Sequence, residues 1–224
     1  MQMWMAWNMG PTALVITAVA FALVLAALLS RAAYLLPRTL DAQLPSEPTP
    51  AHRRYRTVFW LAAPILALLC TLRFGAPPAT LAAIVYVVVL LTLAWIDAET
   101  GFLPDMLTIP LLWLGLLVNL GGTFSMLNDA VVGAAAGYLV LWVICGLFLM
   151  LTGRQGMGHG DFKLLAALGA WLGWAPLPWI LLISSLLALA VTLLLRISGR
   201  LKAGEAFSFG PYLAITGITV LLVL

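Results

Sequence analysis

Long apolar runs recur along almost the whole chain, and they constrain its fold more than any other feature. Of the 224 residues, 64% are hydrophobic and only 8% are charged, whereas soluble domains are about a quarter charged. A helix of about 20 apolar residues spans the hydrocarbon core of a bilayer, and lipid excludes unpaired backbone. The period-two alternation of β-barrel strands is absent. We therefore predict an all-α integral membrane protein.

The apolar runs predict a polytopic bundle of about eight transmembrane helices. The run after residue 161 is short, so it could form a tilted or partly immersed helix. Residues 1–224 are expected to form a single domain, in which residues 1–56 supply the first span and a short loop and residues 57–224 form the core. The expected spans are 12–36, 57–72, 80–96, 106–120, 130–151, 162–174, 177–195 and 207–224.

Basic residues predict the orientation of these spans. With eight spans, ten of the eleven Lys and Arg residues lie on the side of the first loop, and only Arg73 lies on the other side. The positive-inside rule then places the basic loops in the cytoplasm and both termini outside. We read the net charge of +3 as a mark of topology, and we expect a lipid bilayer rather than a nucleic acid as the partner.

Two polar segments interrupt the apolar runs on the predicted cytoplasmic face. Residues 95–105 include Asp97, and residues 156–163 include Asp161. The expected topology puts the two aspartates at the same membrane depth, although 64 residues separate them. Other candidate site residues of the two segments are Glu99, Pro104, Asp105, Gly158, His159, Gly160 and Lys163.

Both structural and functional interpretations fit the carboxylates. Asp161 could cap a helix that starts at residue 162, whereas the glycines before it could admit a substrate backbone. Asp97 ends an apolar helix, where the macrodipole disfavours an anion, so a functional role is favoured. Asp105 follows Pro104 and suits an N-cap. Glu99 and Glu205 fit solvated loop charges or an acidic rim for a basic substrate.

The cationic and sulfur-containing residues give weaker signals. Lys163 could extend to the interface or tune the Asp161 carboxylate. His159 fits a structural or substrate-facing role, because a metal site needs partners and the other histidine, His52, lies in the first loop. Cys70 and Cys145 lie inside apolar runs and fit small core residues. We expect no metal site.

The tryptophans at 171, 174 and 179 are typical of an aromatic belt, and Asn119 of a helix cap.

Two aspartates brought together can hydrolyse an amide without a metal. Like charges a few ångströms apart do not both ionise, so the pair shares a proton. One carboxylate activates water and the protonated one polarises the scissile carbonyl. The main alternative is a transporter or scaffold that relays ions through its carboxylates. It would require a path through an outer half that holds few ionisable residues. A third alternative is an inactive assembly factor.

The motifs around the aspartates resemble those of a known family. Gly158-x-Gly160-Asp161 resembles the GxGD signature of membrane aspartyl proteases. The pattern is similar to that of the bacterial type IV prepilin peptidases over roughly residues 80–224. The other motifs that carry the resemblance are Asp97 followed by Leu103-Pro104-Asp105, Thr108-x-Pro110, and Phe209-Gly210-Pro211-Tyr212.

The resemblance implies an inner-membrane aspartic endopeptidase with Asp97 and Asp161 as its catalytic pair and residues 57–224 as its peptidase core. Such enzymes remove the basic leader of prepilins or pseudopilins at the cytoplasmic face, cutting after glycine and before a hydrophobic helix. Many members also have a larger first loop with two zinc-binding CxxC pairs, and they methylate the product with S-adenosylmethionine. Here residues 37–56 contain no cysteine. We therefore expect no zinc, no cofactor for the peptidase, and S-adenosylmethionine only if methylation is retained.

Overall fold

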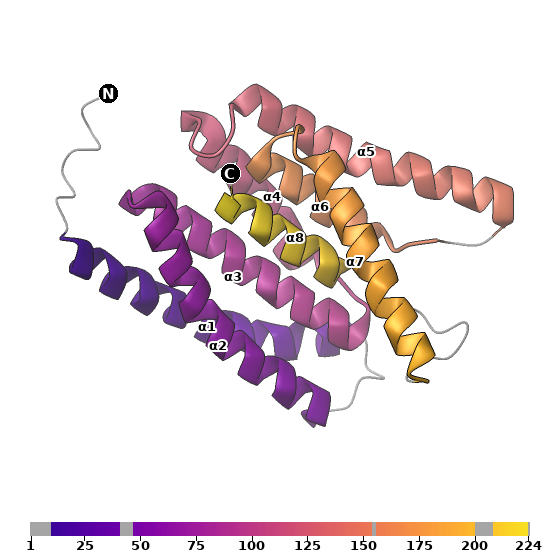
Figure 1. Ribbon diagram of the computed structural model, residues 1–224, viewed down its shortest axis with the longest axis horizontal. Helices are drawn as coiled ribbons and strands as arrows, with labels where there is room; N and C mark the ends of the chain where they lie inside the picture. Colours follow the sequence, from indigo (N-terminus) through magenta and orange to yellow (C-terminus); the bar gives the residue numbers. More distant parts are fainter. Residues whose placement is uncertain (1–9, 41–46, 154–155, 200–207, 224) are drawn as a thin grey trace. The chain divides into compact units, whose positions relative to one another are not determined.

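The structure is a computed structural model that describes residues 10–40, 47–153, 156–199 and 208–223. These residues form helices joined by short turns, without a strand (Figure 1). The prediction of an all-α fold is confirmed. The helices are α1 (Pro11–Leu40), α2 (Pro50–Phe74), α3 (Pro77–Thr100), α4 (Asp105–Val118), the 3-10 helix η1 (Asn119–Gly121), α5 (Leu127–Thr152), α6 (His159–Leu172), α7 (Leu177–Ile197) and α8 (Gly210–Val223).

Five of the described helices are long and apolar enough to cross a membrane, namely α1, α2, α3, α5 and α7. The other three, α4, α6 and α8, have 14 residues each, fewer than the roughly 20 that span a hydrocarbon core. The prediction of a multi-pass membrane protein is confirmed. That all eight helices cross the bilayer stays a prediction.

The chain divides into two compact packing units, unit 1 (residues 1–92) and unit 2 (residues 93–224). In unit 1, α1 and α2 pack side by side (Figure 1). Ala18, Ala22 and Ala26 recur every four residues on one face of α1, and all three are buried. Small residues at this spacing let helices approach closely in a membrane. Whether 1–224 folds as one domain stays a prediction.

In unit 2, α6 lies between α5 and α8 and also packs against α4 (Figure 1). Every residue from Asp161 to Leu172 is buried except Lys163. The contact with α5 depends on glycines. A Cβ atom added to Gly137 would lie 2.6 Å from the carbonyl oxygen of Leu165, and one added to Gly169 would overlap the Gly133 backbone. The short α6 is therefore the core of unit 2.

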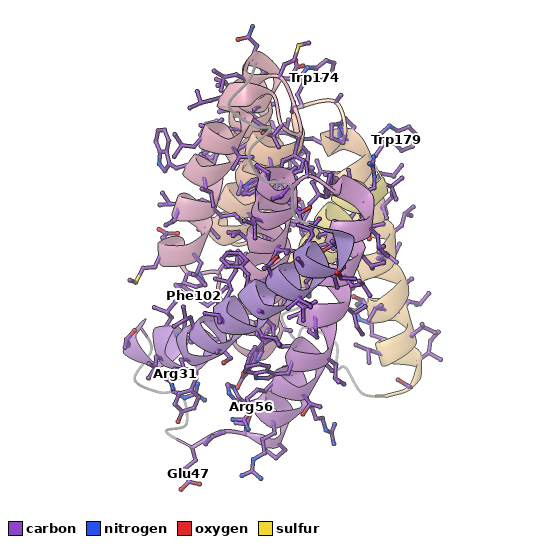
Figure 2. All side chains as sticks on the ribbon, turned by 90° about the vertical axis from the view of Figure 1, so that its left-hand side faces the viewer. Arg31, Glu47, Arg56, Phe102, Trp174 and Trp179 are labelled. Carbon is purple, nitrogen blue, oxygen red and sulfur yellow. The ribbon has the colours of Figure 1, made fainter. Side chains whose placement is uncertain are left out.

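The aromatic-belt prediction is wrong for one tryptophan. Trp171 is fully buried, because its indole N–H donates a 2.8 Å hydrogen bond to the Leu111 carbonyl and its ring occupies the space beside Gly115. Trp174 and Trp179 are exposed and lie toward the same end of unit 2, away from Phe102 (Figure 2). These two stay candidates for the belt.

Asn119 does more than the helix cap that its position predicts. Its amide nitrogen donates to the carbonyl oxygens of Ala170 and Trp171, each at 2.9 Å. Its amide oxygen accepts from the backbone N–H groups of Phe124 and Ser125, at 3.0 and 3.1 Å. The buried side chain therefore fixes the turn after α4 to the last turn of α6.

Replacing Asn119 by alanine is expected to lower the free energy of unfolding by about 3 kcal/mol, because buried carbonyl and N–H groups would lose their partners. The measurement is the midpoint of thermal unfolding of the purified protein in detergent. Asn128→Ala is the matched control, since Asn128 is exposed. Equal midpoints for the two variants would contradict the assigned role.

Candidate active site

Asp97 lies in the last turn of α3, where the chain leaves the helix. Gly101, with φ of 67°, ends α3, and its N–H bonds to the Asp97 carbonyl at 2.8 Å. The Ser208 hydroxyl donates to the same carbonyl, also at 2.8 Å. The side chain is 5% exposed. Both the end of α3 and the segment before α8 therefore hold the Asp97 backbone in place.

Asp161 is the third residue of α6 and is 8% exposed. The helix begins at His159, with Gly158 at the N-cap, three residues before the predicted start at 162. The prediction of Asp161 as an N-cap is therefore wrong. Gly160 packs on the chain after α3, because an added Cβ would lie 2.8 Å from Leu103 Cβ. Gly158, by contrast, faces open space within 4 Å.

Asp97 lies beside the start of α8, and its carboxylate is near enough to Asp161 for its charge to act there. A Cβ added to Gly210 would lie 2.6 Å from Asp97 Oδ2, and the Gly210 backbone N–H interacts with the Asp97 carboxylate. The Asp97 charge acts in turn on Asp161. Among the described residues, neither Asp97 Oδ2 nor Asp161 Oδ1 has a hydrogen-bond partner, although both atoms are buried. Buried polar atoms are normally paired, so these two oxygens are free to meet a water molecule or a substrate.

Burial, reinforced by the nearby Asp97 carboxylate, raises the pKa of Asp161 from 3.8 to about 7. Asp161 lies in the first turn of α6, outside the five helices long enough to span a membrane. The folded protein binds this proton more tightly than the unfolded chain, so the free energy of unfolding falls as pH rises from about 4 to about 7. Near neutral pH the pair can hold one shared proton.

Lys163 and Asp105 form an ion pair next to the aspartates. The Lys163 ammonium lies 2.7 Å from both carboxylate oxygens of Asp105, with side chains 31% and 53% exposed. Asp105 is the first residue of α4, and the N-cap is Pro104, so the N-cap prediction for Asp105 is wrong. The pair joins α4 to α6. The raised pKa of Asp161 is caused by burial and by the Asp97 charge, and Lys163 is not among its causes.

The remaining predicted site residues lie around this pair. Glu99 belongs to the last turn of α3 rather than to a loop, and it accepts a 3.0 Å hydrogen bond from the Trp95 indole. His159 is exposed, with its ring 5.3 Å from that of Phe162. Glu205 lies outside the described residues. Within the described part of the chain, no three His, Cys, Asp or Glu residues are grouped to hold a metal ion.

A hollow of about 240 Å³ lies between the second half of α5 and the start of α6. His159 and Phe162, which flank Asp161 in sequence, both line it. The lining is largely apolar and includes one thiol. Its other residues are Trp142, Cys145, Gly146, Leu149, Gly156 and Met157.

Three residues that position the aspartates are missing from the site predicted by sequence reasoning. Gly210 touches the Asp97 carboxylate, Ser208 holds the Asp97 carbonyl, and Leu103 packs under Gly160. The available signal was the resemblance of residues 209–212 and 103–105 to family motifs. That signal marks the segments, but it does not show which atoms they meet.

Comparison with known proteins decides the family. The model of the type IV leader peptidase family matches residues 84–193, which include both aspartates. A prepilin leader peptidase/N-methyltransferase of Burkholderia pseudomallei is 50% identical over 173 residues, covering 77% of this chain and 56% of that protein. The chain belongs to the type IV leader peptidase family.

Other proteins of this family give the same result. The prepilin leader peptidase/N-methyltransferase of Aeromonas hydrophila is 49% identical over 173 residues, covering 77% of this chain and 59% of that protein. That of Neisseria gonorrhoeae is 46% identical over 145 residues, covering 65% and 49%. The chain spans about half the length of these relatives. No solved structure is significantly similar.

Proposed function

We propose that this leader peptidase family member is an aspartic endopeptidase that removes the leader from prepilins or pseudopilins. The observation that carries the proposal is that two buried carboxylates, Asp97 and Asp161, come from helices far apart in sequence and that the charge of Asp97 acts on Asp161. Each has an oxygen without a hydrogen-bond partner among the described residues. The relatives are prepilin leader peptidase/N-methyltransferases, which supports the choice of substrate.

In the proposed reaction Asp97 is the general base and Asp161 the general acid. Asp161 is the better acid, because burial and the nearby Asp97 carboxylate raise its pKa to about 7, so that it keeps a share of its proton near neutral pH. Asp97 takes a proton from water as the water oxygen bonds to the scissile carbonyl carbon. Asp161 gives its proton to the carbonyl oxygen. The proton on Asp97 then passes to the leaving nitrogen as the C–N bond breaks and Asp161 regains its own.

The hollow beside α6 fits an apolar side chain next to the scissile bond. Its volume of about 240 Å³ suits one large side chain, and His159 and Phe162 place it on the helix that carries Asp161. The open space at Gly158 suits the glycine backbone before the cut. The half-buried Glu99 could attract the basic leader.

The proposed setting is the bacterial inner membrane, with the site facing the cytoplasm and both termini in the periplasm. The asymmetry of the basic residues supports this orientation. An ion-relay function would need further buried ionisable side chains. Of the described residues of unit 2, only Asp97 and Asp161 are charged residues that are buried, which favours hydrolysis over relay.

The proposed peptidase needs no cofactor. Residues 37–56 contain no cysteine, so we do not assign zinc to this loop. S-adenosylmethionine enters the proposal only as the cosubstrate of a retained methylation step. Adding or omitting S-adenosylmethionine in one digestion distinguishes methylation from cleavage.

One digestion tests the proposal directly. The purified full chain in detergent is incubated with a synthetic prepilin segment that contains a basic leader, a glycine and an apolar helix. Mass spectrometry then identifies the new N-terminus, with and without S-adenosylmethionine. Cleavage after the glycine supports the proposal, and one additional methyl group that depends on S-adenosylmethionine shows methylation. Intact substrate under all conditions would overturn it.

The cleavage rate is expected to fall as pH rises above about 7, because the proton that Asp161 must donate is then lost. Well above this pH, kcat/KM should fall about tenfold per pH unit. The measurement is kcat/KM for the same peptide between pH 5 and 9. Asp105→Asn should show the same profile, because Asp105 is exposed and paired with Lys163. A rate that increases through pH 7 to 9 would contradict the assignment of Asp161 as the acid.

A further inference from the structure

Two arginines from different helices line one hollow in unit 1. Arg31 comes from α1 and Arg56 from α2, and together they border a hollow of about 590 Å³ and an adjoining one of about 320 Å³. Figure 2 shows both side chains on the same side of unit 1. The remaining lining residues are Ser30, Thr57, Trp60 and Leu61 of the first hollow, and Ser30, Tyr34, Leu35, Pro48 and His52 of the second.

The charges of this pair are not neutralised within the described part of the chain. Arg31 and Arg56 both belong to helices long and apolar enough to span a membrane, and both side chains are exposed. Neither forms an ion pair with a described residue, and no acidic residue lines either hollow. The Glu47 carboxylate points away from the side chains of Arg31 and Arg56 (Figure 2). Two like charges that border one hollow without an acidic partner among the described residues suit the binding of an anion.

The wall of the second hollow is built by packed side chains. The rings of Tyr34 and His52 pack edge to face, with 5.3 Å between their centroids. The Arg38 guanidinium lies over the Tyr34 ring, 4.0 Å from its centroid. His52 is buried, and its backbone N–H donates a hydrogen bond to the Thr49 hydroxyl at 3.0 Å. Arg38 is thus already engaged, whereas Arg31 and Arg56 face the hollow.

We propose that this hollow binds the headgroup of an anionic phospholipid, with Arg31 and Arg56 on the phosphate. Arginine recognises phosphate through paired hydrogen bonds, and basic pockets between membrane helices bind anionic headgroups. Trp60 suits the headgroup level. The exposed Leu61 and Ile65 continue along α2 and offer an apolar track for an acyl chain. This inference is independent of the proposed peptidase activity.

Native mass spectrometry of the full chain in detergent tests the site. The protein is titrated with dioleoylphosphatidylglycerol, with dioleoylphosphatidylcholine or with inorganic phosphate, and thermal unfolding is followed in parallel. The wild type should bind phosphatidylglycerol at least about tenfold more tightly than phosphatidylcholine. Arg31→Gln/Arg56→Gln should abolish this difference, and Arg31→Lys/Arg56→Lys should keep part of it.

The matched control is Arg53→Gln/Arg54→Gln, which removes the same charge near the start of α2 from residues outside both hollows. It should bind phosphatidylglycerol as the wild type does. Equal losses in the two glutamine variants would overturn the site in favour of general charge attraction. Equal binding of both lipids would overturn it as well. If inorganic phosphate saturates the site and phosphatidylglycerol binds no more tightly, the ligand is a free anion and the lipid assignment is overturned. If Arg31→Gln/Arg56→Gln does not fold, the binding of the three ligands to the wild type and to the lysine variant still tests the proposed site.

Discussion

Replacing either buried aspartate by asparagine is expected to lower the rate of prepilin cleavage by about a thousandfold or more. Asp97→Asn removes the group that takes the proton from water, and Asp161→Asn removes the group that donates to the carbonyl. Asparagine has nearly the same shape, so the loss would reflect chemistry rather than packing. Because the two carboxylates act as a unit, the double variant should be little worse than either single variant.

The measurement is single-turnover cleavage of the synthetic prepilin segment by purified variants in detergent. Asp129→Asn is a matched control, because Asp129 lies in the first turn of α5 and accepts a hydrogen bond from the Trp174 indole, outside the site. Its rate should match that of the wild type. Full cleavage by Asp97→Asn or Asp161→Asn would remove that residue from the mechanism, while the family membership would stand.

The sequence predicted the helices well because long apolar runs have few solutions in lipid. Each expected span corresponds to a helix in the structure. The start of α6 was misplaced because Gly, His and Asp are weak helix formers, so residues 159–161 resemble a loop. Their helical conformation comes with tertiary packing, since α6 is enclosed by α4, α5 and α8. Local propensity carries no information about that enclosure.

The proximity of Asp97 and Asp161 was within reach of sequence reasoning, because the distribution of basic residues predicts that both lie on one face of the membrane. The side chains that complete the site were not, because their roles depend on atomic contacts. Trp171 is one case: a tryptophan near a span end favours a belt, but the absent side chain of Gly115 makes room for it inside. Lys163 is another, because its partner Asp105 lies 58 residues earlier.

Replacing Gly210 by alanine is expected to lower kcat for cleavage by about a hundredfold, the scale of loss for a catalytic group displaced by about 1 Å. The added Cβ would lie 2.6 Å from Asp97 Oδ2 and 3.1 Å from its Cγ, so the carboxylate would have to move. The change would also disturb the Gly210 N–H that interacts with the Asp97 carboxylate. The measurement is kcat and KM for the synthetic segment, with thermal unfolding of the same samples.

Gly210 has no positive φ, and alanine is the better helix former, so backbone strain does not explain a loss of rate. Gly121→Ala is the matched control, because an added Cβ there meets nothing within 4 Å and its φ is also not positive. It should leave kcat unchanged. A Gly210→Ala variant with wild-type kcat would contradict the prediction, because it would show that cleavage does not depend on the position that the Asp97 carboxylate has beside Gly210. A lower kcat with an unchanged midpoint of unfolding would instead tie the loss to the placement of Asp97.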